Sequence, residues 1–276
     1  MNGLYLIQGY MRLTIQHTTH YRYDVSPKQW VQLLRLTPRN EIHQRVLNWH
    51  ISIPGHLTNF IDAFYNQSHI HTLREPHTNL CIAVEGVVEL NTLIDGRLLT
   101  LPANETIPAL TYLTPTALTE NVKGIAELAW QVLPNGLQVP DDALSLAVAI
   151  NQVIQYTAGM TNVTSTAAQA FQLASGVCQD HAHVMIVACR ALGIAARYVS
   201  GYVDPGNSRA AASHAWVDIY LNQNWYSVDV TNCLFASDAH CRLAIGRDYL
   251  DASPVRGIRD GGHNEYLDVL VNVYGV

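Results

Sequence analysis

The sequence predicts an α+β protein, in which a β-rich first part precedes a part that mixes helices and antiparallel strands. Apolar residues alternate with a period of two in the first part and recur with a helical period from Glu120 onward. A second run of alternating strands follows Ile194. Helices followed by antiparallel strands are typical of an α+β core. We therefore expect an N-terminal β-rich domain at 11–95, a connecting region at 96–118 and a second domain at 119–276.

Short strands fill the β-rich domain, and turn signals that contain proline separate them. Antiparallel strands at this spacing predict a sandwich-like arrangement. The connecting region holds Pro102, Pro108 and Pro115 among threonines, and we expect it to be a loop. The strands are predicted at Met11–His17, Trp30–Leu36, Leu47–Ile53, His69–Arg74 and Leu80–Leu90.

The second domain begins with helices and ends with strands. Its most apolar run starts at Cys178 and predicts a buried helix, which Gly193 ends. Because the run is apolar over most of its length, the helix should lie in the core of the domain. Other helices are predicted at Val122–Val132, Asp141–Tyr156 and Ala167–Ala174, and strands at Ile194–Tyr202, His214–Leu221, Trp225–Val230 and Glu265–Tyr274.

Composition and charge argue against several classes of protein. The net charge is −6 and no basic stripe occurs, which argues against nucleic-acid binding. No stretch approaches the roughly 18 apolar residues of a membrane span. Residues 1–10 lack a signal-peptide pattern, and we interpret them as an extension before the first strand. The five cysteines form no disulfide framework. We therefore expect a cytoplasmic protein that binds neither nucleic acid nor membrane.

Cys178 is the strongest candidate for a nucleophile. It follows the small-residue turn Ser175-Gly176 and begins the buried helix. A thiol at a helix N-terminus lies against the positive end of the helix dipole, which favours the reactive thiolate. Cys189 lies in the middle of the same helix and should be buried and inert. The remaining cysteines, Cys81, Cys233 and Cys241, have no partner pattern.

His214 and Asp229 follow Cys178 in the order of a nucleophile, a base and an orienting acid. His214 begins a strand with one apolar face and one mixed face, which we expect to form a cleft wall. A two-residue loop at 222–223 would place Asp229 diagonal to His214 on the mixed face. A three-residue loop would turn Asp229 toward the core. Asp218 shares the mixed face and is the rival orienter.

Short motifs along the chain carry a family resemblance. They are Gly176-Val177-Cys178-Gln179-Asp180, Arg197-Tyr198-Val199-Ser200-Gly201-Tyr202, Ser213-His214-Ala215-Trp216, Val228-Asp229, Gly246-Arg247-Asp248-Tyr249 and Pro254-Val255-Arg256-Gly257. They resemble the transglutaminase-like superfamily, in a bacterial cysteine-protease-like branch whose β-rich N-terminal domain is transglutaminase-associated. The resemblance spans nearly the whole chain. It implies a papain-like core, in which the helix that bears the cysteine packs on an antiparallel sheet.

The resemblance also implies thiol-dependent acyl transfer on amide or isopeptide bonds, with Cys178, His214 and Asp229 as the catalytic triad. If water accepts the acyl group, the enzyme is a cysteine peptidase or amidase. We favour this hypothesis because the branch is described that way and no calcium-loop pattern occurs. If an amine accepts it, the enzyme is a protein-glutamine transglutaminase. A non-catalytic peptide-binding module with a vestigial site is the third hypothesis. No cofactor is implied, and the expected partner is a peptide or protein substrate.

Other residues near the motifs have weaker assignments. Asp180, in the first helical turn, should satisfy free N–H groups there. Cys178, His181 and His183 resemble zinc ligands, but no second ligand pair closes the set. The backbone N–H of Cys178 is the first candidate oxyanion donor. The side-chain candidates for oxyanion or substrate contacts are Gln172, Tyr156, Trp216, Tyr249 and Arg256, with Arg247 beside them.

Overall fold

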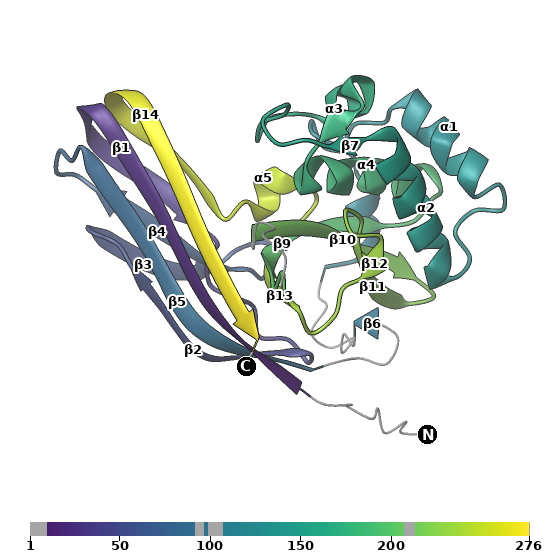
Figure 1. Ribbon diagram of the computed structural model, residues 1–276, viewed down its shortest axis with the longest axis horizontal. Helices are drawn as coiled ribbons and strands as arrows, with labels where there is room; N and C mark the ends of the chain where they lie inside the picture. The colour runs from purple at the N-terminus through teal and green to yellow at the C-terminus, as the bar shows by residue number, and fades with distance from the viewer. Residues whose placement is uncertain (1–9, 92–96, 99–106, 207–212, 276) are drawn as a thin grey trace.

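A computed structural model describes residues 10–91, 97–98, 107–206 and 213–275. Two domains lie side by side, a curled β-sheet and a domain of helices on a second sheet (Figure 1). The predicted α+β fold class is confirmed. Apart from Tyr10, the predicted extension at 1–10 lies outside the described residues. In the described part of the chain, no helix is long and apolar enough to cross a membrane.

The N-terminal domain is one curled antiparallel sheet, ordered β2-β5-β1-β4-β3. Along one edge of the long strand β1, β5 pairs with residues 10–22 and β4 with residues 30–34. β14 pairs along the other edge of β1. β1 runs unbroken from Tyr10 to Leu34, where the sequence predicted two strands and a turn. The turn signal Pro27 lies at a bulge, where the register with β14 shifts. A bulge accommodates a residue that has no N–H for the ladder. The other strands are β2 Gln44–Ser52, β3 His56–Ile61, β4 Gln67–Leu73, β5 Asn79–Asn91 and β14 Val255–Gly275.

β14 crosses back from the second domain to the first sheet. It pairs with β1 from Leu13 opposite Gly275 to Leu34 opposite Val255, and Figure 1 shows the two strands running together. The strand predicted at Glu265–Tyr274, near the end of 119–276, is therefore part of the first sheet. In the middle of β14, Gly261 pairs with Pro27 at the bulge between the two strands.

The second domain packs helices on one face of a sheet ordered β12-β11-β10-β9-β13. Its central helix, α4, is buried along most of its length, and its apolar side chains share a core with Val217 and Ile219 of β10. The elements are η1 Ala109–Leu113, α1 Lys123–Val132, α2 Pro140–Val153, α3 Ala167–Leu173, α4 Cys178–Ala191, α5 Tyr249–Ala252, β6 Arg97–Leu98, β7 Gln155–Tyr156, β8 Ser175–Gly176, β9 Ala196–Val203, β10 Ser213–Leu221, β11 Asn224–Asp229, β12 Leu234–Phe235 and β13 His240–Gly246.

β13 is a buried strand that the sequence did not predict. Its alternation breaks at a bulge between Arg242 and Ala244, which hides the period of two. Side-chain amides from the first domain bind its backbone. Gln44 accepts the N–H of Arg242 at 2.7 Å and donates to its carbonyl at 2.8 Å. Asn66 does the same to Ile245 at 2.9 and 2.8 Å. These bonds satisfy the outer edge of β13 and join the domains.

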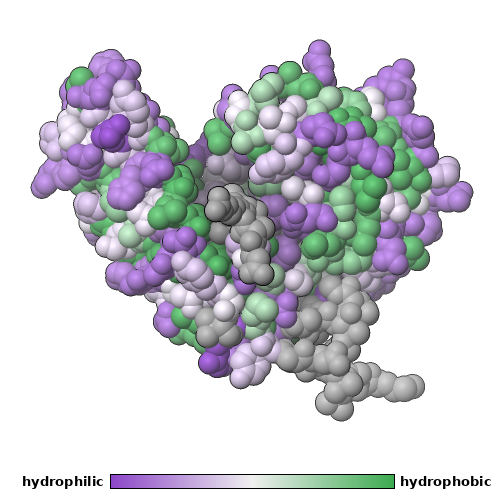
Figure 2. Space-filling model, in the orientation of Figure 1, coloured by the Kyte–Doolittle hydropathy of each residue, from purple (hydrophilic) through white to green (hydrophobic). Residues whose placement is uncertain are grey.

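An apolar layer also joins the two domains. Leu13 and Ile15 of β1 share a core with Tyr202 of β9 and with Cys241 and Leu243 of β13. The layer lies along β9 and β13, at the edge of the second sheet that meets the first domain. Figure 2 shows the two lobes and the hollow between them from one side. The shared core fixes the second sheet against the first domain.

Candidate active site

The hairpin of β10 and β11 has the two-residue loop that the triad hypothesis requires. Leu221 pairs with Asn224. The loop residues Asn222 and Gln223 have φ angles of 51° and 63°. Two positive φ angles are typical of a type I′ turn, which matches the twist of paired strands. The register therefore places Asp229, the last residue of β11, on the face of the hairpin that carries His214.

The structure brings the three predicted triad residues together. Nε2 of His214 lies 2.9 Å from Oδ2 of Asp229, as in an ion pair. The side chain of Cys178 lies close enough to the same imidazole ring to raise the pKa of His214. Because Nε2 faces the carboxylate, Nδ1 is the ring nitrogen that remains for the thiol. Cys178 is half-buried at the start of α4, His214 is 9% exposed and Asp229 is fully buried.

The buried carboxylate controls the charge of His214. Burial alone would lower the pKa of His214, but Asp229 and Cys178 raise it to about 10. Against the effect of burial, contacts with His214, His240 and Asn232 hold the pKa of Asp229 far below its usual range. A charged imidazole ring beside a thiol favours the thiolate. The site therefore holds a positively charged ring beside the candidate nucleophile.

Asp229 has two partners that the sequence did not indicate. Asn232, in the turn after β11, donates its backbone N–H to Oδ1 at 3.1 Å and its amide to Oδ2 at 2.7 Å. Nε2 of His240 lies 3.1 Å from the same Oδ2. His240 comes from β13, the strand that the sequence missed. No motif ties it to Asp229, so only the fold reveals it.

The rival orienter, Asp218, faces other groups. Its Oδ2 accepts hydrogen bonds from Arg242 at 2.6 Å and from Arg197 at 2.9 Å. Its Oδ1 accepts one from Ser227 at 2.8 Å. Although burial opposes it, the two arginines lower the pKa of Asp218. The mixed face of β10 is therefore buried and ion-paired here, where the sequence predicted an open cleft wall.

Trp216 is fully buried, so the structure contradicts its predicted contact with substrate. Its ring centroid lies 6.1 Å from that of His214 and 5.3 Å from that of His240. A Cβ atom on Gly201 would lie 2.4 Å from the Trp216 ring, so glycine is needed on the facing strand. The Trp216 side chain therefore packs against the rings of both histidines and helps to bury them.

Asp180 accepts a free N–H group at the start of α4, as predicted. Its Oδ2 accepts the N–H of Val177 at 2.8 Å and the hydroxyl of Thr161 at 2.6 Å. A Cβ atom on Gly176 would lie 2.6 Å from the Cβ of Asp180. Glycine before the nucleophile therefore allows the cap, and the cap fixes the first turn that carries Cys178.

The two histidines after Cys178, His181 and His183, have different hydrogen-bond partners. The ring of His181 contacts the hydroxyl of Thr231 and the carbonyl of Ile154, both at 3.1 Å. Nε2 of His183 accepts the N–H of Tyr249 at 3.1 Å. Burial lowers the pKa of His183 to about 3, so this ring stays neutral. These bonds give both histidines packing roles and leave the zinc alternative without support.

The two side-chain oxyanion candidates lie in different places. Tyr156 pairs with Gly176 in the short parallel ladder of β7 and β8, close to the nucleophile. Burial and the neighbouring Cys178 raise the pKa of Tyr156, which places its hydroxyl in the field of the thiolate. Gln172 is exposed on α3 and does not join the contacts described above. Of the two, Tyr156 is the better placed.

The predicted substrate-side loop is divided between the domains. Tyr249 lies in α5, with its ring 6.2 Å from that of Tyr198. Burial and Cys178 raise the pKa of Tyr198, so this missed residue also neighbours the nucleophile. Arg256 lies exposed on β14, in the first sheet. Arg247 forms a 2.8 Å ion pair within its own turn. The sequence therefore overestimated how much of this segment surrounds Cys178.

Comparisons with known proteins identify the family. Residues 13–89 match the bacterial transglutaminase-like N-terminal region, and residues 131–230 match the core of the transglutaminase-like superfamily. An uncharacterised protein of Mycobacterium leprae is 30% identical over 276 residues, which cover 95% of this chain and 98% of the relative. An uncharacterised protein of Mycobacterium tuberculosis H37Rv is 29% identical over an alignment of 298 residues, which covers 97% of this chain and 94% of the relative.

A solved structure shares the fold. The crystal structure described as "a Putative Cysteine Protease from Cytophaga hutchinsonii" superimposes with a TM-score of 0.81. It is 22% identical, and the match covers 98% of this chain and 92% of that one. The chain therefore belongs to the transglutaminase-like superfamily and carries the bacterial N-terminal region of that family.

Proposed function

We propose that this protein is a cysteine-dependent hydrolase of amide or isopeptide bonds in a peptide or protein substrate. One observation carries the proposal: His214 lies between the side chain of Cys178 and the carboxylate of Asp229. A base that contacts a nucleophile on one side and an acid on the other is the arrangement of a nucleophilic triad.

In the first half of the proposed reaction, Sγ of Cys178 attacks the carbonyl carbon and forms a C–S bond. Protonated His214 gives its proton to the leaving nitrogen as the C–N bond breaks, and a thioester remains on the enzyme. The backbone N–H of Cys178 and the N-terminal end of α4 face the developing oxyanion.

In the second half, neutral His214 takes a proton from a water molecule whose oxygen attacks the thioester. The C–S bond breaks, the acid product leaves and the thiolate–imidazolium pair returns. Asp229 stays ionised throughout and stabilises the positive ring, because two histidines and Asn232 oppose its protonation.

The second nucleophile decides between hydrolysis and transfer. Water gives a peptidase or amidase, and a primary amine such as lysine gives a transglutaminase. The description of the Cytophaga hutchinsonii protein as "a Putative Cysteine Protease" favours hydrolysis. Both reactions use the same thioester, so one assay can compare the two acceptors.

The first experiment maps iodoacetamide labelling of the five cysteines near pH 7. We expect Cys178 to react fastest, and His214→Ala to slow it. Burial raises the pKa of Cys189 to about 12 and also raises the pKa values of Cys233 and Cys241, so these thiols should react slowly. Faster labelling of Cys81, which is half-buried, would remove the nucleophile assignment.

The second experiment screens a peptide and isopeptide library, with and without a labelled primary amine. We expect free acid products from the wild-type protein and none from Cys178→Ala. Amine adducts would identify the transglutaminase instead. A protein with a slow Cys178 and no product in either assay would be the non-catalytic binding module.

A further inference from the structure

His240 is a buried side chain of the site that the reaction above does not use. It is 6% exposed and begins β13. In the second sheet, β9 and β10 separate β13 from β11, which carries Asp229. The 3.1 Å contact between Nε2 of His240 and Oδ2 of Asp229 therefore joins strands that no backbone ladder connects.

The partners of His240 determine where its proton lies. The backbone N–H of Ser237 donates to Nδ1 at 3.2 Å, so Nδ1 acts as an acceptor and carries no hydrogen. An ionised carboxylate can only accept, so Nε2 must donate to Asp229. Both contacts are satisfied by one neutral tautomer, with the hydrogen on Nε2.

Oδ2 of Asp229 receives three groups, His214 at 2.9 Å, His240 at 3.1 Å and Asn232 at 2.7 Å. Within the described residues, Oδ1 receives the backbone N–H of Asn232 alone. Without His240, two of the three remaining contacts would come from Asn232, which lies on one side of the carboxylate. Oδ2 would then keep only one donor besides His214, the amide of Asn232, to hold it toward the His214 ring.

We propose that His240 is a positioning residue, which aims Oδ2 of Asp229 at the His214 ring and so supports the thiolate–imidazolium pair. This inference rests on the proposed function, because it gives Asp229 the role of orienter. His240 touches no reacting atom in this scheme and acts only through the carboxylate.

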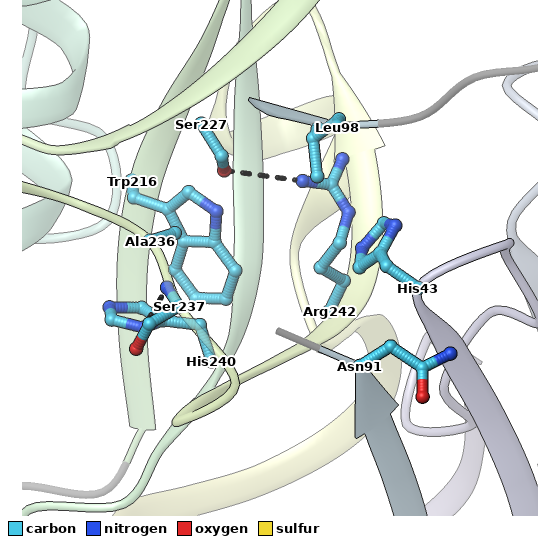
Figure 3. A pocket seen from close by; sticks show the side chains of 9 residues that line it. All are labelled: His43, Asn91, Leu98, Trp216, Ser227, Ala236, Ser237, His240 and Arg242. Atoms are coloured by element: carbon cyan, nitrogen blue, oxygen red, sulfur yellow. Dashed lines mark hydrogen bonds between the residues drawn. The ribbon is translucent and has the colours of Figure 1, made fainter. Parts of the chain in front are cut away.

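The packing around His240 keeps its ring in place. The Trp216 ring meets it edge to face, with centroids 5.3 Å apart and planes at 82°. Figure 3 shows His240 beside Ser237 and Trp216, at the wall of a cavity of about 20 Å³. A space of this size has room for about one water molecule. An alanine at 240 would enlarge it and could admit a substitute donor, so same-shape variants make the better test.

Two variants of His240 separate its two hydrogen bonds. His240→Gln places an amide N–H near the former Nε2 and can still donate to Asp229. His240→Asn places an oxygen near the former Nδ1 and can still accept from Ser237, but it cannot reach Asp229. The measurement is the rate of Cys178 alkylation by iodoacetamide at pH 7, followed by kcat and KM on any peptide that the library screen identifies.

We expect His240→Asn to slow alkylation and to lower kcat by about tenfold with little change in KM, since one bond to a charged group is lost. His240→Gln should stay within about threefold of wild type. His71→Asn is the matched control, because His71 is a buried, hydrogen-bonded histidine of the first sheet. Equal rates for wild type and His240→Asn, or equal losses in the two His240 variants, would overturn the proposal.

A double-mutant cycle tests the route of the effect. In an Asp229→Asn background, His240→Asn should change the alkylation rate by no more than about twofold, because its target is gone. A full tenfold loss in that background would overturn the proposal. Failure of the proposed function gives a different result, since wild-type Cys178 would then not be the fastest thiol.

Discussion

Asp218 and Asp229 lie on the two strands of one hairpin and bind different kinds of side chain. Both are fully buried, and both have lowered pKa values. Asp218 is paired with Arg197 and Arg242, whose guanidinium groups stay charged at any ordinary pH. Asp229 is paired with His214 and His240, and an imidazole ring, unlike a guanidinium group, can give up a proton during a reaction.

The difference shows how one fold uses a buried carboxylate in two ways. Arg242 also lies 3.0 Å from Glu41 of the first domain, so the Asp218 network ties the domains together with fixed charges. The Asp229 network leads through His214 to Cys178, the candidate nucleophile. Permanent charges suit a structural tie, whereas a titratable partner is needed for proton transfer.

The largest effect should come from Asp229→Asn. By analogy with triads elsewhere, loss of the orienter lowers kcat by up to about 10⁴ while the fold survives. We expect KM and the far-UV circular dichroism spectrum to change little. Turnover close to wild type would show that His214 works without this carboxylate.

Asp218→Asn should weaken the buried network that Asp218 forms with Arg197 and Arg242. Two buried arginines would lose a charged partner, and breaking a buried ion pair costs about 3–5 kcal/mol of unfolding free energy. Urea unfolding measures this loss. The folded fraction should keep activity within about tenfold of wild type. The reverse ranking, with Asp218 needed for turnover and Asp229 for stability, would exchange the two roles.

The pH dependence of stability should sharpen the contrast. Because the pKa of His214 is raised from 6.5 to about 10, its stabilisation is complete below pH 6.5 and is lost as the pH rises toward 10. Between pH 6.5 and about 8.5, below the usual cysteine range, the Tm of wild type should fall relative to that of His214→Gln. The shift should be about 2–4 °C per kcal/mol. Parallel Tm curves would contradict the raised pKa.

The smallest effect should come from the two-residue loop at 222–223, which sets how β10 and β11 pair. Gln223 has a φ of 63°, which glycine adopts without a Cβ penalty. Gln223→Gly should raise the unfolding free energy by about 0.5 kcal/mol, after the entropy of glycine in the unfolded chain is subtracted. Urea unfolding measures the gain, and iodoacetamide labelling of Cys178 should not change. A loss of stability would mean that the Gln223 side chain stabilises the turn.

The sequence predicted the parts of this comparison that depend on local patterns. Strand alternation and a two-residue loop are properties of adjacent residues, so they suffice to place Asp229 on the same face as His214. The same alternation could not separate Asp229 from Asp218. That choice depends on Arg197 and Arg242, which reach Asp218 from β9 and β13.

Long-range pairing explains what the sequence did not predict. Pro27 and Gly261 resemble turn residues, but they pair with each other at a bulge within two long strands. β13 carries two buried polar side chains, His240 and Arg242, that a sequence pattern assigns to the surface. His240 has no motif, because its partner lies across two intervening strands.

The return of β14 to the first sheet has a consequence for synthesis of the protein. The first sheet cannot be completed on the ribosome until all 21 residues of β14 have emerged, after the whole second domain. Until then one edge of β1 waits without a partner, and open strand edges recruit other chains. A nascent chain that stalls before Val255 would carry a second domain with its strands in place beside a sheet that is still open along its longest strand.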